Sequence, residues 1–91
     1  MNISFVPINV RLLFFAKARE LSGRNEITYQ IDKTKIIAND LLQHICTDFN
    51  LEAIRQSLIL AINEDYCDDL QTELQLKEGD EIAIIPPISG G

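Results

Sequence analysis

The stretch GDEIAIIPPISGG, residues 79–91, decides the interpretation of this chain. Its apolar centre, residues 82–85, has hydrophobic side chains at consecutive positions, which is typical of a strand covered on both faces or paired in parallel. The pair Pro86-Pro87 then stiffens the backbone, and the pair Gly90-Gly91 has no side chains. The sequence therefore predicts a central strand that leads directly into a thin C-terminal arm.

The rest of the chain has the composition of one small globular domain. Of its 91 residues, 46% are hydrophobic and 24% are charged, which excludes a disordered chain. A domain of this size has room for one core but not for a deep active-site cleft as well. We expect a loose lead-in over residues 1–7, a domain over 8–86 and a flexible tail over 87–91. This size favours a carrier or binding module over a free-standing enzyme.

The hydrophobic pattern predicts four clear strands and one main helix. The strands are expected at Ile8–Phe15, Glu26–Ile31, Leu58–Ile62 and Glu81–Pro86. Apolar residues recur at helical spacing over Ala38–Phe49, with Asn39 as the candidate N-cap unless Ala38 is already helical. This order of elements predicts an α+β fold in which a single mixed sheet packs on the main helix.

The segments between these elements are predicted to be short. Gly23 stands where the C-cap of a short helix over Ala16–Ser22 would lie, so the first two strands should pair antiparallel. A second helical turn is expected over Leu51–Gln56, followed beyond the third strand by a polar turn over Asn63–Asp69. The stretch Leu70–Leu76 is ambiguous, but its end alternates like a short edge strand.

The formal net charge of −6 limits the classes of partner. It argues against nucleic acid and anionic membranes, which call for clustered Lys and Arg. It fits a partner with a basic docking surface, although solubility alone explains such a charge equally well. The chain shows no signal-like opening and no run of about 18 apolar residues, so we expect a cytosolic protein.

The reactive side chains do not suggest a catalytic or metal site. Cys46 shares the apolar stripe of the main helix, and the carboxylates beside Cys67 disfavour its thiolate. His44 has no nucleophile pattern near it, and the acidic cluster within Glu64–Asp69 lacks the spacing of a calcium loop. We expect no bound cofactor and no metal, which leaves the tail as the candidate site. Its carboxylate becomes a good electrophile only if an outside enzyme activates it.

Three blocks in order give the chain its resemblance. They are FFAKARELSG at 14–23, AINEDY at 61–66 and the closing stretch at 79–91. With them the chain resembles the small-subunit family of molybdopterin synthase, whose members are ubiquitin-like (β-grasp) sulfur carriers. The resemblance implies a two-stage cycle. An activating enzyme of the E1 type adenylates the C-terminal carboxylate with ATP, and a sulfur donor converts it to a thiocarboxylate. A large synthase subunit, paired with the carrier in a heterotetramer, then transfers the sulfur to a pyranopterin precursor.

The resemblance also assigns roles by position. It makes Gly91 the sulfur-carrying residue and Gly90 its flexible approach. The residues expected at the channel entrance of the large subunit are Pro86, Pro87, Ile88 and Ser89. Phe14 and Phe15 are candidates for contact with a partner, with core packing as the alternative for each. The carrier itself is expected to have no catalytic site.

Two other functions remain open from the sequence. The fold and tail would also suit a thiamine-type sulfur carrier, or a ubiquitin-like modifier whose Gly91 is joined to lysines. A passive interaction domain with an inert tail is the second alternative. The blocks at 14–23 and 61–66 favour the molybdopterin synthase family.

Overall fold

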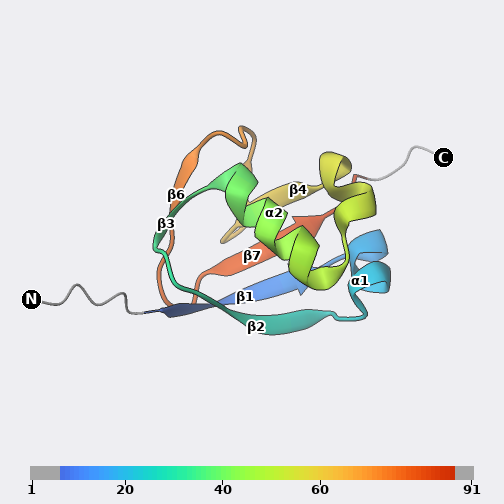
Figure 1. The fold of residues 1–91 in the computed structure, drawn as a ribbon, viewed down its shortest axis with the longest axis horizontal. Coiled ribbons are helices and arrows are strands. Elements are labelled where there is room, and N and C mark those ends of the chain that lie inside the picture. Colours follow the sequence, from blue (N-terminus) through green and yellow to red (C-terminus); the bar gives the residue numbers. More distant parts are fainter. Residues whose placement is uncertain (1–6, 88–91) are drawn as a thin grey trace, which may run out of the picture.

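Five strands form one mixed sheet, and the longest helix lies across one of its faces (Figure 1). A computed structural model describes residues 7–87. In chain order the elements are β1 (Ile8–Phe14), α1 (Ala16–Ser22), β2 (Glu26–Ile31), β3 (Lys35–Ile37), α2 (Ala38–Phe49), the 3-10 helix η1 (Glu52–Ser57), β4 (Ile59–Ile62), β5 (Asp65–Cys67), β6 (Glu73–Gln75) and β7 (Glu81–Ile85). The predicted α+β class, with a mixed sheet packed on one main helix, is confirmed.

The strand order in the main sheet is β2-β1-β7-β4-β5. β1 pairs antiparallel with β2 and parallel with β7, and β7 pairs antiparallel with β4. The last strand of the chain is therefore the middle strand of the sheet, as its unbroken apolar run predicts. Its two neighbours hold it along its length, so the backbone that follows Ile85 starts from the centre of the fold rather than from an edge.

The core lies between the main sheet and α2. Alternate residues of β1 and β7, among them Leu12, Phe14 and Ile84, point to the helix and are at most 2% exposed. They meet a buried stripe on α2 that includes Leu41 and Ile45. Burying one such aliphatic side chain contributes about 1.5–3 kcal/mol, so this layer supplies most of the driving force for folding.

The helices are capped in two ways: a local glycine ends α1, and backbone from a distant segment caps the start of α2. Gly23 adopts φ 72° and ends α1, as predicted, with its N–H donating to the carbonyl oxygen of Arg19 at 2.9 Å. Helix α2 has the predicted bounds, and the alternative in which Ala38 is already helical holds, so the N-cap is Ile37 rather than Asn39. The N–H groups of Ala38 and Asn39 donate to the carbonyl oxygens of Thr72 and Leu70, at 2.9 and 2.8 Å. Backbone from a distant loop thus replaces the side-chain cap.

Two short strands correct the sequence prediction. β5 occupies the middle of the segment predicted as a polar turn, because Asn63 and Glu64 alone reverse the chain between Ile62 and Asp65. β3 was not predicted, and it pairs with β6 in a separate two-stranded sheet. The expected edge strand near Leu74 therefore exists, but it belongs to this second sheet. Both missed strands have only three residues, too few for a readable alternation.

Candidate functional site

The root of the tail is the end of β7. Pro86 is half-buried and Pro87 is exposed, so the chain leaves the core within two residues of the last strand. The N–H of Phe15 donates to the carbonyl oxygen of Ile84 at 3.2 Å, which ties the root to the start of α1. Figure 1 shows α1 and the yellow turn of η1 at this same end of the sheet. The predicted tail residues Ile88, Ser89, Gly90 and Gly91 lie outside the described residues.

The face of the sheet opposite α2 carries an apolar surface that reaches this root. We call it the open face, and its apolar residues are Leu13, Phe15, Ile59, Ala61, Tyr66, Ala83 and Ile85. Among the described residues, the exposed large hydrophobic side chains are Phe15 (45%), Ile59 (38%) and Tyr66 (66%), and all three belong to it. A contiguous apolar surface of this kind on a small domain marks an interaction site.

The open face is hollowed at its centre. The paired residues Ala61 and Ala83 form the floor, and larger side chains such as Phe15, Tyr66 and Ile85 stand around it. The hollow measures about 290 Å³. Two adjacent methyl side chains between bulky neighbours leave space that another protein's side chain can fill, which is the usual shape of a binding hot spot.

The two phenylalanines named as candidate contacts fall on different sides of the sheet. Phe14 is 2% exposed, and its ring packs on Phe49 with centroids 5.1 Å apart. The core-packing alternative therefore holds for Phe14, which has no surface to offer a partner. Phe15 lies on the open face beside Ile85, so it alone of the pair is available for docking.

Sequence reasoning missed most of the open face. Ala83 and Ile85 alternate with the buried residues of β7, but an apolar run on both faces gave no indication of which face stays uncovered. Tyr66 lay in a segment predicted as a turn. The sequence trace of the hollow is the pair of small residues, Ala61 and Ala83, within otherwise bulky strands, but it locates the hollow only once β4 is known to pair with β7.

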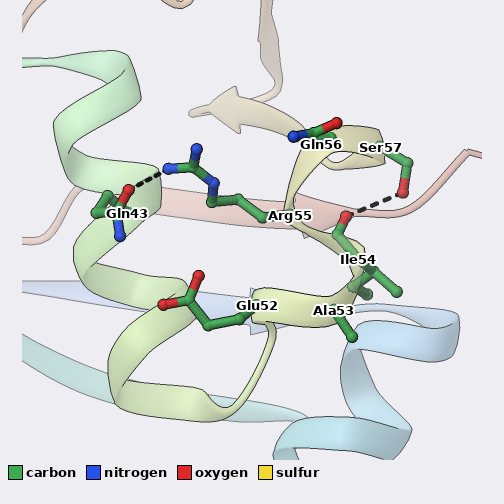
Figure 2. Close-up of a pocket in the computed structure, with 7 residues that line it drawn as sticks. All are labelled: Gln43, Glu52, Ala53, Ile54, Arg55, Gln56 and Ser57. Atoms are coloured by element: carbon green, nitrogen blue, oxygen red, sulfur yellow. Dashed lines mark hydrogen bonds between the residues drawn. The ribbon is translucent and has the colours of Figure 1, made fainter.

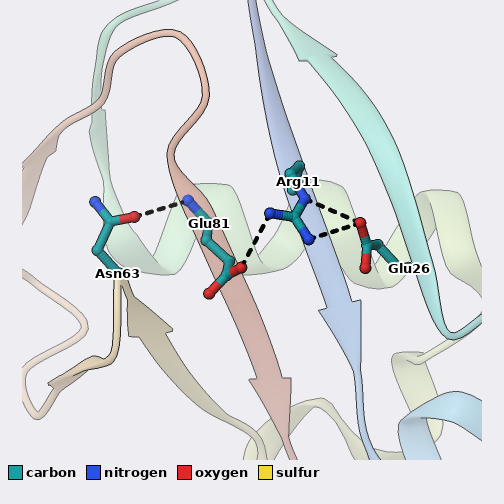
Figure 3. A network of polar contacts seen from close by, with 4 residues as sticks. All are labelled: Arg11, Glu26, Asn63 and Glu81. Carbon is teal, nitrogen blue, oxygen red and sulfur yellow. Dashed lines mark hydrogen bonds and ion pairs between the residues drawn. The ribbon is translucent and has the colours of Figure 1, made fainter.

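Glu81 lines the hollow and starts β7, at the end of the strand far from the tail root. It belongs to a network of polar contacts (Figure 3). Arg11 pairs with Glu26 on β2 at 2.7 Å and with Glu81 on β7 at 3.3 Å, so one guanidinium spans three strands. Asn63 accepts a hydrogen bond from the N–H of Glu81 at 2.9 Å and donates to Asp80 at 3.0 Å. These contacts hold the first residue of β7 in register, so they stabilise the strand that carries the tail.

A larger polar hollow of about 610 Å³ lies between α2 and η1 (Figure 2). Arg55 reaches across it to donate to the side-chain oxygen of Gln43. The hydroxyl of Ser57 donates to the backbone oxygen of Ile54 at 2.9 Å, so its hydrogen-bond partner is a carbonyl oxygen rather than a general base. We assign this hollow no chemistry.

The cysteines are not set up as nucleophiles. Burial raises the pKa of the Cys46 thiol to about 11, with the Glu52 carboxylate adding to the effect. The pKa of Cys67 is also raised, mainly by burial, and its sulfur lies 3.4 Å from the carbonyl oxygen of Asp69. A raised pKa keeps both groups as thiols near neutral pH. His44 is exposed on α2.

The described residues contain no group of three His, Cys, Asp or Glu side chains placed to hold a metal ion. None of the described helices is long and apolar enough to cross a bilayer. What the described part of the chain does offer is a docking face next to a rigidly held tail root.

Comparison with known sequences agrees with this arrangement. A profile of the ThiS family matches residues 12–91. The chain is 50% identical over 91 residues to the molybdopterin synthase sulfur carrier subunit of Drosophila melanogaster, covering 100% of both chains.

Solved structures give the same fold. The solution structure of the Haloferax volcanii HVO 2177 protein matches with a TM-score of 0.74 at 23% identity, over 93% of this chain and 88% of that one. The ubiquitin-like domain of mouse tubulin-specific chaperone e matches with a TM-score of 0.65 at 13% identity, over 98% and 97%. A complex of subunits 1 and 2 of molybdopterin-converting factor from Helicobacter pylori matches with a TM-score of 0.60 at 25% identity, over 92% and 100%. The predicted ubiquitin-like fold is thereby confirmed.

Proposed function

Because the chain belongs to the ThiS family, we propose that it is the sulfur carrier subunit of a molybdopterin synthase. The observation that carries this proposal is the 50% identity, over the full length, to the Drosophila melanogaster subunit of that name. The geometry supports it, since a carrier needs a tail on a firm base and a face on which its partners can dock.

In the proposed cycle the Gly91 carboxylate attacks the α-phosphorus of ATP on an E1-like activating enzyme. Pyrophosphate leaves and a glycyl adenylate forms. A sulfide equivalent from a sulfur donor then attacks the acyl carbon and AMP leaves, which gives the thiocarboxylate. Transfer of that sulfur to a pyranopterin precursor, with water supplying the replacement oxygen, restores the carboxylate. Two such transfers would complete the dithiolene of molybdopterin.

The domain's part in this cycle is to present the tail. An extended chain from Pro86 to Gly91 spans roughly 16 Å, enough to carry the carboxylate from a docked domain into a buried site. Ordering about four flexible residues costs on the order of 4–8 kcal/mol. Docking through the open face offsets this cost, and the prolines reduce it by stiffening the base of the tail. Gly90 lets the last step enter a narrow channel, because it has no Cβ.

The proposed partner is the large, catalytic subunit of the synthase, in a heterotetramer with one carrier at each end. A likeness to the Helicobacter pylori complex of subunits 1 and 2 supports a two-subunit assembly. Catalysis of the transfer falls to that partner, since the described cysteines are held as thiols and the Ser57 hydroxyl donates to a carbonyl oxygen rather than to a base. The chain binds no cofactor of its own in this scheme, and ATP is used by the activating enzyme.

Intact-mass measurement tests the proposal. The chain is produced with its activating enzyme and sulfur source, and the expected species has one oxygen replaced by sulfur at Gly91. A matched variant with one residue added after Gly91 should show no such species and should support no molybdopterin synthesis. Full synthesis by that extended variant, or lysine conjugates in place of the thiocarboxylate, would contradict the proposal.

A further inference from the structure

Within residues 7–87, β2 is an edge strand of the main sheet, and the orientation of its backbone groups can be assigned. The N–H of Phe14 donates to the carbonyl oxygen of Asn25 at 2.8 Å. In an antiparallel ladder every second residue repeats this orientation, so residues 27, 29 and 31 also point to β1. The N–H and C=O groups of Glu26, Thr28 and Gln30 therefore point outward, away from the sheet. Within β2 there is no proline or lysine of the kind that normally blunts an edge.

We propose that this edge pairs with the same edge of a second copy of the chain. The two β2 strands would run antiparallel about a two-fold axis at Thr28, which joins two five-stranded sheets into one. In this register Thr28 faces its own counterpart, and Glu26 faces Gln30 of the second copy. All three outward-pointing residues of each strand then form hydrogen-bonded pairs. This interface lies beyond the proposed sulfur-carrying function and does not depend on it.

The side chains favour this register on the open face. Thr opposite Thr and Glu opposite Gln are favourable or neutral cross-strand pairs. A two-fold axis at Glu26 would instead set two carboxylates against each other. An axis at Gln30 would set Thr28 opposite Asp32 of the second copy, which lies beyond the end of its β2 strand. The Thr28 axis is therefore the one that uses the whole edge without opposing like charges.

The helix side of the edge is also self-complementary. Ile27 and Tyr29 point toward α2 and are only half-buried, because no strand of the described part of the chain lies beyond them in the sheet. With the axis at Thr28, Ile27 of the second copy falls opposite Tyr29. A groove of about 290 Å³ beside Tyr29, lined also by Ile31, Ile36 and Leu41, lies between this edge and α2. The second copy's isoleucine would cover its open side.

The arrangement leaves the functional end free. β2 and β5 are the opposite edges of the sheet (Figure 1). The hollow of the open face is lined from β1, β7, β4 and β5, and no residue of β2 lines it. Because β2 strands pair antiparallel, the two β7 strands would also run in opposite directions. The dimer would thus present two tail roots at its two ends, each with its own open face.

The dimer should be weak and should strengthen with salt. A single pair of six-residue strands buries much less than the roughly 800 Å² per partner of a standard interface. Each copy carries a formal charge of −6, so repulsion between copies opposes pairing at low ionic strength. Screening shortens the Debye length to about 3 Å at 1 M salt and removes most of this repulsion.

Cysteine cross-linking tests the register. In a background with Cys67→Ser, Thr28→Cys should form a disulfide-linked dimer on mild oxidation, since hydrogen-bonded pairs place Cα atoms about 5.5 Å apart, within disulfide range. The matched control is Gln30→Cys. Position 30 of one copy faces position 26 of the other, so the two introduced cysteines lie four residues apart along the strands, about 13 Å, and this variant should stay monomeric. Equal cross-linking of both variants, or of neither, would overturn the proposal.

A charge pair of variants tests the interface without a cross-link. Thr28→Lys sets two lysines against each other, whereas Gln30→Lys sets each lysine against Glu26 of the second copy. Both change the net charge equally. Sedimentation equilibrium should show at least about tenfold weaker association for the first variant and equal or tighter association for the second.

The wild-type chain should associate more tightly at high salt in the same measurement. Thermal unfolding confirms that each variant is folded, and the cysteine pair decides the register if Thr28→Lys does not fold. A wild-type chain that stays monomeric at every concentration and salt level would overturn the proposal. Hydrogen exchange gives a second such outcome. If the amides of Glu26, Thr28 and Gln30 become protected only when another protein is added, β2 pairs with that protein and not with a second copy of the chain.

Discussion

The covered and open faces of the main sheet are built from alternate residues of the same strands, yet they meet different surroundings. Phe14 is 2% exposed under α2, and its neighbour Phe15 is 45% exposed on the other side. Ile84 and Ile85 divide in the same way at the end of β7. Side chains under the helix supply stability, and those opposite it are available for recognition. Substitutions one residue apart should therefore change different measured quantities.

The largest expected effect is on the covered face. Phe14→Ala removes a ring that packs on Phe49, and leaves a cavity between the sheet and α2. The free energy of unfolding should fall by about 3–5 kcal/mol, measured by urea denaturation. Phe14→Leu is the control and should recover most of the loss. A loss below about 1 kcal/mol for the alanine variant would show that Phe14 is not a core residue.

The matching change on the open face should affect binding instead. Phe15→Ala should change the free energy of unfolding by less than about 0.5 kcal/mol. It should weaken binding to the proposed large subunit by about 2 kcal/mol, because exposed aromatic side chains beside a hollow act as hot spots. Calorimetric titration measures the affinity, with His44→Ala on the opposite side of the molecule as the control. Unchanged affinity for Phe15→Ala would remove the open face from the docking surface.

The buried side of α2, which packs on the covered face, should also make the stability of the protein sensitive to alkaline pH. The pKa of Cys46 is about 11 in the folded chain, against an ordinary value of 9.0. The unfolded chain therefore loses this proton first as pH rises. The contribution of the Cys46 thiol to the free energy of unfolding is fully present well below pH 9 and is lost as pH rises from about 9 to about 11. Between pH 8 and 9.5 the free energy of unfolding should fall about 1 kcal/mol further in the wild type than in Cys46→Ala. Parallel pH profiles for the two proteins would contradict this.

The smallest expected effect lies at the border of the open face. Glu64 adopts φ 74° in the two-residue turn between β4 and β5, a conformation that glycine adopts without steric cost. Glu64→Gly should raise the free energy of unfolding by about 0.5–1 kcal/mol, whereas Glu64→Ala should not. Thermal denaturation separates the two variants. A destabilised glycine variant would mean that the Glu64 side chain makes a contact that outweighs this strain.

The two faces also differ in how far the sequence predicts them. The covered face follows from the sequence, because the apolar stripe of Ala38–Phe49 and the alternation of β1 identify residues such as Leu12 and Leu41 as buried. The open face does not follow, since β7 is apolar at every central position. The number of helices that cover a sheet depends on chain topology, and local periodicity carries no information about it.

The candidate site shows the same division. The Gly90-Gly91 tail and the Pro86-Pro87 pair can be located from residue types alone, because their backbone properties are local. The hollow could not be located in this way. Ala61 and Ala83 are 22 residues apart in the chain and become neighbours only through the pairing of β4 with β7.

By itself, the sequence determined the main helix, the strands of four or more residues, the central position of β7 and the tail that follows it. These features rest on periodicity and on the backbone preferences of glycine and proline, which act over a few residues. Only the tertiary structure decided which side of the sheet α2 covers, and therefore that Phe14 is core and Phe15 is surface. It also decided that α2 begins at Ala38, because the carbonyl oxygens that cap it come from Leu70 and Thr72. Such contacts join distant parts of the chain, and their energy exists only once the fold has brought those parts together.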